Sequence, residues 1–272
     1  IDAKIGSEDT DFIILVDGAF KHESMDEIIT VSDRTVTIPL RGYNSKITII
    51  GTQVFSQVTP APTVVPQQQI EKKIGTLSNT SKMPAYSWGI SAYKCNVGSL
   101  LVKINGTVCH KCYALTGFFR MKNTKMSQET RLNAISMPEW VDYMTELLTL
   151  KYKKLPKDKH YHRWFCSGDI QSHEHLMKIF EVCESTKFLK HWLPTREYQI
   201  INQIKYEDIP KNLVIRASGI KIDGQPPKFW KWTSTVHTKN PIGYVCPAYL
   251  QDRQCKACRT CWHRSVKQVS YK

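Results

Sequence analysis

The chain has 272 residues, of which 41% are hydrophobic and 23% charged, and its formal net charge at pH 7 is +14. This composition predicts a globular protein with one or two domains and excludes a disordered chain. No apolar run approaches about 18 residues, so we expect no membrane-spanning helix and no membrane partner. The positive charge suits a polyanionic partner such as nucleic acid, although a solvated basic surface is an equally good explanation.

The first part of the chain, residues 1–58, has the pattern of a small β-rich domain. Short β-branched runs occur at residues 12–16, 28–31, 36–40 and 47–50. Residues 59–80 follow and are rich in proline and glutamine near their start. Because proline fixes φ and has no N–H to donate, we interpret residues 59–80 as an extended linker between two domains.

The pattern of residues 81–272 predicts an α/β domain, and the cysteines described below indicate that it binds a metal. Expected helices and strands alternate along this segment: helix 129–150, strand 163–166, helix 172–185, strand 188–193, helix 198–205 and strand 213–218. This alternation is typical of parallel βαβ units. We therefore expect a partial (βα) barrel or an open parallel sheet.

Nine cysteines give the strongest chemical signal, and their number is odd. A first group consists of Cys95, Cys109 and Cys112, spaced C-x13-C-x2-C. Three thiolates are too few to saturate a zinc ion or a four-iron cluster, so such a cluster would keep one iron open. The alternative is that these cysteines are small buried hydrophobic residues.

A second group consists of Cys246, Cys255, Cys258 and Cys261, spaced C-x8-C-x2-C-x2-C. Four thiolates close a structural site, and this spacing is closer to a ferredoxin ligand run than to a zinc ribbon. We expect one or two 4Fe-4S clusters in the chain, with zinc as the alternative at this second group.

Polar residues lie at the carboxyl ends of three of the expected strands, where parallel α/β folds bind their ligands. They are Ser167, Gly168, Asp169, Arg196 with its neighbour Glu197, and Arg216 with Ser218. We expect Asp169 and Arg196 to be catalytic, and Ser167, Gly168, Asp169, Arg196 and Ser218 to bind a cofactor. The alternative is that Asp169 caps a helix and that Arg196 and Glu197 form a local ion pair.

Four motifs together resemble the phage-encoded gene-product-88-like family over about residues 83–272. They are the segments 83–95 with 109–114, 165–170, 192–197, and 246–248 with 255–262. The resemblance implies a phage origin and a cysteine-rich site, but no particular reaction. The first cysteine group is also loosely similar to radical SAM enzymes, whose open iron binds S-adenosylmethionine, although its spacing is longer than theirs.

Two functions remain open at this point. The first is an iron–sulfur phage protein that acts as a radical-SAM-like or other cluster-dependent enzyme. The second is a non-catalytic, metal-stabilised phage protein that binds nucleic acid or a virion or host protein. A phage origin implies the cytoplasm of the infected host, with association with the virion as the alternative.

Overall fold

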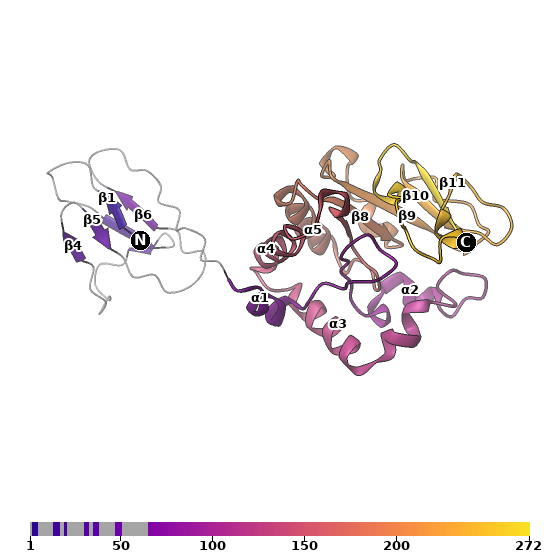
Figure 1. Cartoon of the computed structure of the whole chain (residues 1–272), viewed down its shortest axis with the longest axis horizontal. Helices are drawn as coiled ribbons and strands as arrows, with labels where there is room; N and C mark the ends of the chain where they lie inside the picture. Colours follow the sequence, from indigo (N-terminus) through magenta and orange to yellow (C-terminus); the bar gives the residue numbers. More distant parts are fainter. Residues whose placement is uncertain are drawn as a thin grey trace. The chain divides into compact units, whose positions relative to one another are not determined.

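The computed structural model describes residues 65–272 and, before them, the backbone of six short strands. The chain divides into two compact units, Ile1–Val65 and Pro66–Lys272. The strands of the first unit form two antiparallel three-stranded sheets, in the orders β1-β5-β4 and β3-β2-β6 (Figure 1). Their bounds are β1 Asp2–Lys4, β2 Ile13–Val16, β3 Ala19–Phe20, β4 Thr30–Ser32, β5 Thr35–Thr37 and β6 Ile47–Ile50. Part of the expected linker, residues 59–64, lies outside the described residues.

The remainder of the expected linker differs from the prediction, because it begins the second unit. Helix α1, Gln67–Ile74, buries Ile70 and Ile74 completely and contacts helices α3 and α4. These two isoleucines are four residues apart and therefore lie on one face of the helix. Because the segment is rich in glutamine and lysine, its two isoleucines did not indicate a buried helix in the sequence.

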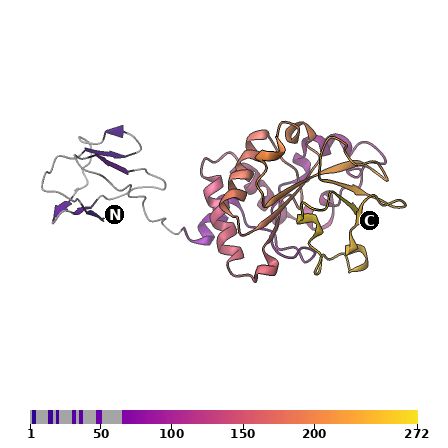
Figure 2. The same cartoon turned by 90° about the horizontal axis from the view of Figure 1, so that it is seen from above.

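The second unit is built on a curled, open sheet of six parallel strands, a half-barrel, in the order β11-β12-β10-β9-β8-β7 (Figures 1 and 2). The strands are β7 Tyr161–Arg163, β8 Lys190–Thr195, β9 Leu213–Ile222, β10 Thr233–Val236, β11 Tyr244–Val245 and β12 Gln268–Tyr271. The expected strands near 163, 190 and 215 are neighbours in this sheet, which confirms the predicted α/β fold with an open parallel sheet.

Proline at position 194 lies inside β8, beyond the end predicted for that strand. The carbonyl oxygen of Trp192 accepts a hydrogen bond from Trp164 N, so the backbone polar groups of Trp192 point towards β7. The backbone groups of every second residue in a strand point to the same neighbouring strand. Pro194 shares that side, but β7 ends at Arg163, which pairs with Trp192. No ladder hydrogen bond is therefore required from the proline nitrogen, and β8 can continue to Thr195.

The helices of this unit are α1, α2 Asn96–Leu101, α3 Lys122–Ala134, α4 Trp140–Tyr152, α5 His173–Ser185 and α6 Tyr198–Ile201. The single helix expected over residues 129–150 is wrong, since α3 ends before Pro138 and α4 begins after it. Proline lacks the N–H that a helix interior needs and disfavours helical backbone in the residue before it. Helix α5 agrees closely with its prediction and is capped by Ser172, whose hydroxyl accepts from His175 N at 3.1 Å.

An aromatic cluster forms much of the core between the sheet and helices α4 and α5. Trp88, Trp140 and Trp164 are fully buried, and the Trp88 ring centroid lies 5.9 Å from each of the other two in edge-to-face contact. His175 on α5 packs against Trp88 and Trp140. The cluster thereby fixes the position of the segment that follows β7, which leads directly to the candidate site.

Candidate cysteine-rich site

The segments that follow β7 and β8 meet at the carboxyl edge of the sheet through Asp169. Asp169 Oδ2 accepts a hydrogen bond from Arg196 N at 2.9 Å, and its Oδ1 accepts from Ile170 N at 2.9 Å. Burial raises the pKa of Asp169 to about 6, although the hydrogen bonds from Thr195 and Arg196 oppose this shift. A carboxyl group with this pKa can take up or release a proton near neutral pH.

The segment that carries the first cysteine group crosses the same edge. Val97 N donates to Glu197 Oε1 at 3.0 Å, which ties α2 to the end of β8. Val108 N donates to Ile220 O at 2.8 Å, and Ile222 N donates to Gly106 O at 3.0 Å. The segment from 95 to 112 is thus attached to the ends of two neighbouring strands, β8 and β9.

Cys95 and Cys109 face a common point beside Gly98. A methyl group added to Gly98 would lie 3.4 Å from Cys95 Sγ and 3.9 Å from Cys109 Sγ. It would also lie only 2.8 Å from Cys95 Cβ, so glycine is required for this close approach. The thirteen residues between these cysteines therefore form a loop that brings Cys109 back beside Cys95.

Electrostatic interactions join the first cysteine group to the strand-end residues. Burial raises the pKa of Cys95, and the charges of Asp169, Cys112, Cys109 and Glu197 raise it further. Burial also raises the pKa of Cys109, whereas the positive charge of Arg196 lowers it. The structure therefore brings Cys95, Cys109 and Cys112 into the same region as Asp169 and Arg196.

The second cysteine group gathers beside β11 and β12. Cys246 directly follows β11, and Cys261 Sγ lies 3.2 Å from Tyr271 Oη at the end of β12. Burial raises the pKa of Cys261 to about 12, and the charges of Cys246 and Cys255 also raise it. The charge of Cys258 raises the pKa of Cys246 and of Cys255. These interactions place all four thiols in one region.

Arg216 holds the backbone of the second cysteine segment. Its side chain is fully buried and donates to the carbonyl oxygens of Cys261, Thr260, His263 and Val266, and to that of Thr233. The expectation that Arg216 and Ser218 lie at the carboxyl end of their strand is wrong, because β9 continues to Ile222. Ser218 is buried within β9, and its hydroxyl contacts Ser234 Oγ at 3.1 Å.

Ser167 and Gly168 also make contacts that differ from the expected cofactor contacts. Ser167 Oγ donates to Ile90 O at 2.7 Å and accepts from Gln128 Nε2 at 2.9 Å. Gly168 has φ +77°, and a Cβ there would lie 2.4 Å from Ile90 Cγ1. The close backbone approach that this glycine permits is therefore to Ile90. Glu197 likewise accepts a hydrogen bond from Val97 N. The sequence had offered a local ion pair between Glu197 and Arg196 as an alternative.

Neither cysteine group closes into a set of metal ligands in the structure. Over the described residues, no group of three or more cysteine, histidine, aspartate or glutamate side chains has an arrangement that could hold a metal ion. Burial raises the pKa of Cys95 in the first group and of Cys261 in the second, and neighbouring thiols raise each further. The expected metal sites are thus not seen.

A model of the Gene product 88 family matches residues 62–264, which is more than half of the chain. The chain belongs to the Gene product 88 family. This confirms the phage-family resemblance, and the match includes both cysteine groups. No curated protein and no solved structure matches this family member. Among its described residues, no helix is long and apolar enough to cross a membrane.

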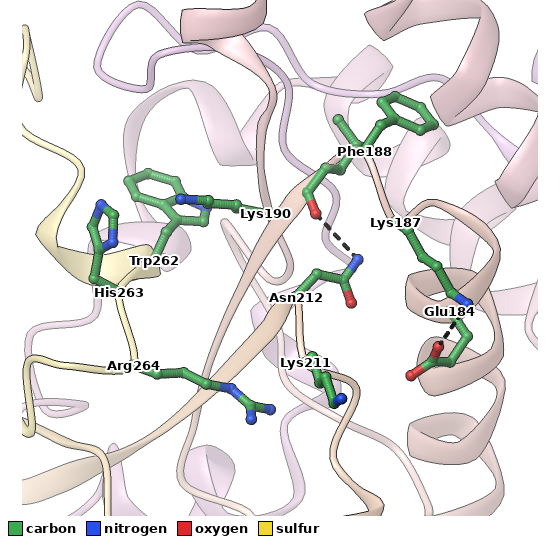
Figure 3. A pocket seen from close by; sticks show the side chains of 10 residues that line it. Glu184, Lys187, Phe188, Lys190, Lys211, Asn212, Trp262, His263 and Arg264 are labelled. Carbon is green, nitrogen blue, oxygen red and sulfur yellow. Dashed lines mark hydrogen bonds and ion pairs between the residues drawn. The ribbon is translucent and has the colours of Figure 1, made fainter.

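This Gene product 88 family member also has a basic hollow of about 640 Å³ at the opposite, amino-terminal edge of the sheet (Figure 3). Lys190 begins β8, and Lys211 precedes β9. Burial lowers the pKa of His263 in this hollow, and the positive charges of Lys190 and Arg216 lower it further. The lining residues are Glu184, Lys187, Phe188, Leu189, Lys190, Lys211, Asn212, Trp262, His263 and Arg264. Positive charge therefore predominates in the hollow.

Proposed function

We propose that this protein is a cluster-dependent phage protein whose two cysteine groups bind iron–sulfur centres. The observation that supports this most directly is the meeting of Cys95 and Cys109 with Asp169 and Arg196 at the carboxyl edge of a parallel sheet. In α/β folds, this edge is where ligands bind. The two charged side chains and the thiols come from separate segments of the chain, and shifted pKa values such as those of Asp169 and Cys109 cluster at functional sites.

The number and spacing of the cysteines support a metal centre at each group, with three thiols in the first and four in the second. Burial and mutual repulsion raise the pKa values of Cys95, Cys109, Cys255 and Cys261, so the isolated thiols resist ionisation. A metal centre removes this cost, because it replaces the thiol protons and stabilises the thiolates. In the proposal Cys95, Cys109 and Cys112 hold one 4Fe-4S cluster, and Cys246, Cys255, Cys258 and Cys261 hold a second. Zinc remains the alternative at the second group.

The first cluster, when bound, would supply an open iron for a small molecule such as S-adenosylmethionine. Arg196 Nε donates to Gly219 O at 3.2 Å, which fixes the guanidinium beside the cysteine segment. Its remaining N–H groups would bind a carboxylate of the ligand. Asp169, with a pKa of about 6, would exchange a proton with an amine or hydroxyl of the ligand. In this proposal the second cluster has a structural role.

Metal analysis of anaerobically purified protein tests the proposal. We expect iron and sulfide in near-equal amounts, and Cys109→Ala should lose one cluster while the second remains. Cys183→Ala, which removes a buried thiol on α5, should retain both. Stoichiometric zinc without iron would contradict the iron–sulfur proposal. S-adenosylmethionine should perturb the electron paramagnetic resonance signal of the first cluster alone, and an unchanged spectrum would contradict the radical-SAM-like role.

The basic hollow favours a second candidate function, the binding of nucleic acid. Lys187, Lys190 and Lys211 are exposed around it, and Glu184 is its single acidic lining residue. Lysines in such a hollow would contact phosphates and release counterions. Binding of single-stranded DNA or RNA should then weaken steeply with added salt. The double variant Lys190→Glu/Lys211→Glu should lose binding, whereas Lys103→Glu should not. Salt-independent binding, or no binding, would contradict this candidate.

A further inference from the structure

A second cavity, of about 280 Å³, lies between helix α3 and the segment that follows β7. It is separate from the cysteine groups, and none of its lining residues is acidic. These residues are Thr76, Leu77, Ser78, Phe119, Asn123, Thr124, Ser127, Gln128, Arg131, Cys166 and Ser167. Hydroxyl and amide groups thus surround one cation, Arg131, in a space that exceeds the roughly 30 Å³ taken up by a water molecule.

Arg131 is buried and has few protein acceptors. Its side chain is only 4% exposed. Nε donates to Thr76 O at 2.8 Å and Nη1 donates to Gly89 O at 2.9 Å. A guanidinium has five N–H donors, so the other three are without an acceptor among the described residues. Burial lowers the pKa of Arg131, and Cys166 is the neighbouring group that opposes this shift.

Arg216 provides a comparison within the same unit. It too is a buried arginine that makes no ion pair with a described carboxylate, but it donates to five carbonyl oxygens. Its charge is therefore dispersed over backbone dipoles. Arg131 has two such bonds and lines an open cavity, so its charge is compensated far less by the protein.

The hydrogen bonds of the cavity wall prepare it for a polar ligand. Gln128 is 3% exposed, and its Nε2 donates to Ser167 Oγ at 2.9 Å. Ser167 Oγ in turn donates to Ile90 O at 2.7 Å, which fixes the orientation of the amide. Asn123, Thr124 and Ser127 come from one side of α3 and add further donors. The wall is therefore held in place before any ligand binds.

From these observations we propose that the cavity binds a small oxyanion, with Arg131 as its principal ligand. A phosphate or carboxylate group would accept two parallel hydrogen bonds from the free edge of the guanidinium. The hydroxyl and amide groups of α3 would bind its remaining oxygens. This site is independent of the iron–sulfur proposal, since it requires neither cysteine group.

Thermal unfolding and isothermal titration calorimetry of the full chain test the proposal, with inorganic phosphate and malonate as probes. The two probes distinguish a phosphorylated ligand from a carboxylate. We expect at least one to raise the Tm saturably above a sodium chloride control of equal ionic strength. Arg131→Met should weaken that binding about ten- to a hundred-fold, as expected for the loss of charge-assisted hydrogen bonds.

Three further variants complete the test. Lys125→Met removes an exposed charge from the same helix, and Lys190→Met removes one from the basic hollow; both should bind the anion as the wild type does. Asn123→Leu should weaken binding by filling the cavity while Arg131 stays intact, which covers the case in which Arg131→Met does not fold. Equal anion binding by wild type and Asn123→Leu, or no saturable effect of either probe, would overturn the proposal.

Discussion

Asp169 Oδ2 accepts a hydrogen bond from the backbone N–H of Arg196, and this 2.9 Å contact joins the segments that follow two neighbouring strands. Replacement by alanine leaves two backbone donors, Arg196 N and Ile170 N, without their acceptor, and each unpaired donor costs about 1–3 kcal/mol. We expect Asp169→Ala to lower the free energy of unfolding by at least this amount in urea titrations. Asp208→Ala, at an exposed position, should leave it unchanged. Equal stability of the two variants would contradict this role of Asp169.

Arg216 should be essential for the second cysteine segment. Arg216→Met would remove the donor from five carbonyl oxygens, of which those of Cys261 and Thr233 are in buried hydrogen bonds. We expect a loss of at least about 3 kcal/mol in unfolding free energy, together with rapid proteolysis between residues 246 and 262. Arg253→Met, at an exposed site, is the matched control. Normal protease resistance in Arg216→Met would show that the segment is held by other contacts.

Three buried histidines should make the protein sensitive to acid. Burial lowers the pKa of His175 and His191 to about 3, from an ordinary value of 6.5, and lowers that of His162 well below it. The unfolded chain therefore binds protons that the folded chain does not, and stability falls as the pH drops from about 6.5 towards 3. Each histidine contributes a slope of about 1.4 kcal/mol per pH unit within this window.

The variant His191→Gln tests this pH dependence. Its amide can replace the contact between His191 Nε2 and Thr186 Oγ1, which is 3.0 Å long. We expect the slope of unfolding free energy against pH, measured by urea titration between pH 4 and pH 6, to fall by about one proton. His173→Gln, at an exposed position, should keep the wild-type slope. An unchanged slope in His191→Gln would show that His191 is already protonated in the folded state.

Gly98 should control the first metal centre if the proposed function is correct. A Cβ at this position would lie 2.8 Å from Cys95 Cβ, so Gly98→Ala must displace the Cys95 side chain. We expect reconstituted Gly98→Ala to contain about one iron–sulfur cluster fewer, with the second group still occupied. Ser99→Ala changes the next, exposed residue and should retain the full iron content. Full occupancy in Gly98→Ala would show that Cys95 is not a ligand.

Helix α1 should be required for the stability of the second unit. Ile74→Ala removes a fully buried side chain, and such substitutions cost about 2–5 kcal/mol. We expect the fragment 66–272 to unfold cooperatively, and the fragment 76–272 to be less stable by a similar or larger amount. Lys72→Ala, on the exposed side of α1, should have no effect. Equal Tm values for the two fragments would mean that the helix is dispensable.

The sequence predicted three neighbouring strands of the sheet, β7, β8 and β9, from short runs rich in apolar residues between expected helices. It did not predict β10, β11 and β12, which are short and largely polar. It also predicted that Asp169 and Arg196 would lie close together, since carboxyl ends of parallel strands lie at one edge. The strand pattern did not predict that the segment with Cys95 and Cys109 would cross this edge. It could not reveal which polar groups bond to the backbone. Ser167, Arg216 and Ser218 resemble ligand-binding residues in sequence, but their partners come from segments distant along the chain.

Arg131 was not a candidate in the sequence, because it lies in a polar helix with little apolar spacing. Its burial results from contacts with Thr76 and Gly89, which no local pattern predicts. Helix α1 was likewise missed, since two isoleucines among glutamines and lysines give a weak signal. In both cases the deciding interaction joins residues more than forty positions apart.

The strand order has a consequence for synthesis of the chain. Strand β12, Gln268–Tyr271, lies between β10 and β11 and is translated after both. While residues 268–271 are still on the ribosome, β10 and β11 have unpaired edges and the second cysteine segment lacks its contact with Tyr271. Unpaired strand edges promote aggregation in nascent chains. A chain truncated before residue 268 should therefore expose these edges, aggregate readily and depend on chaperones.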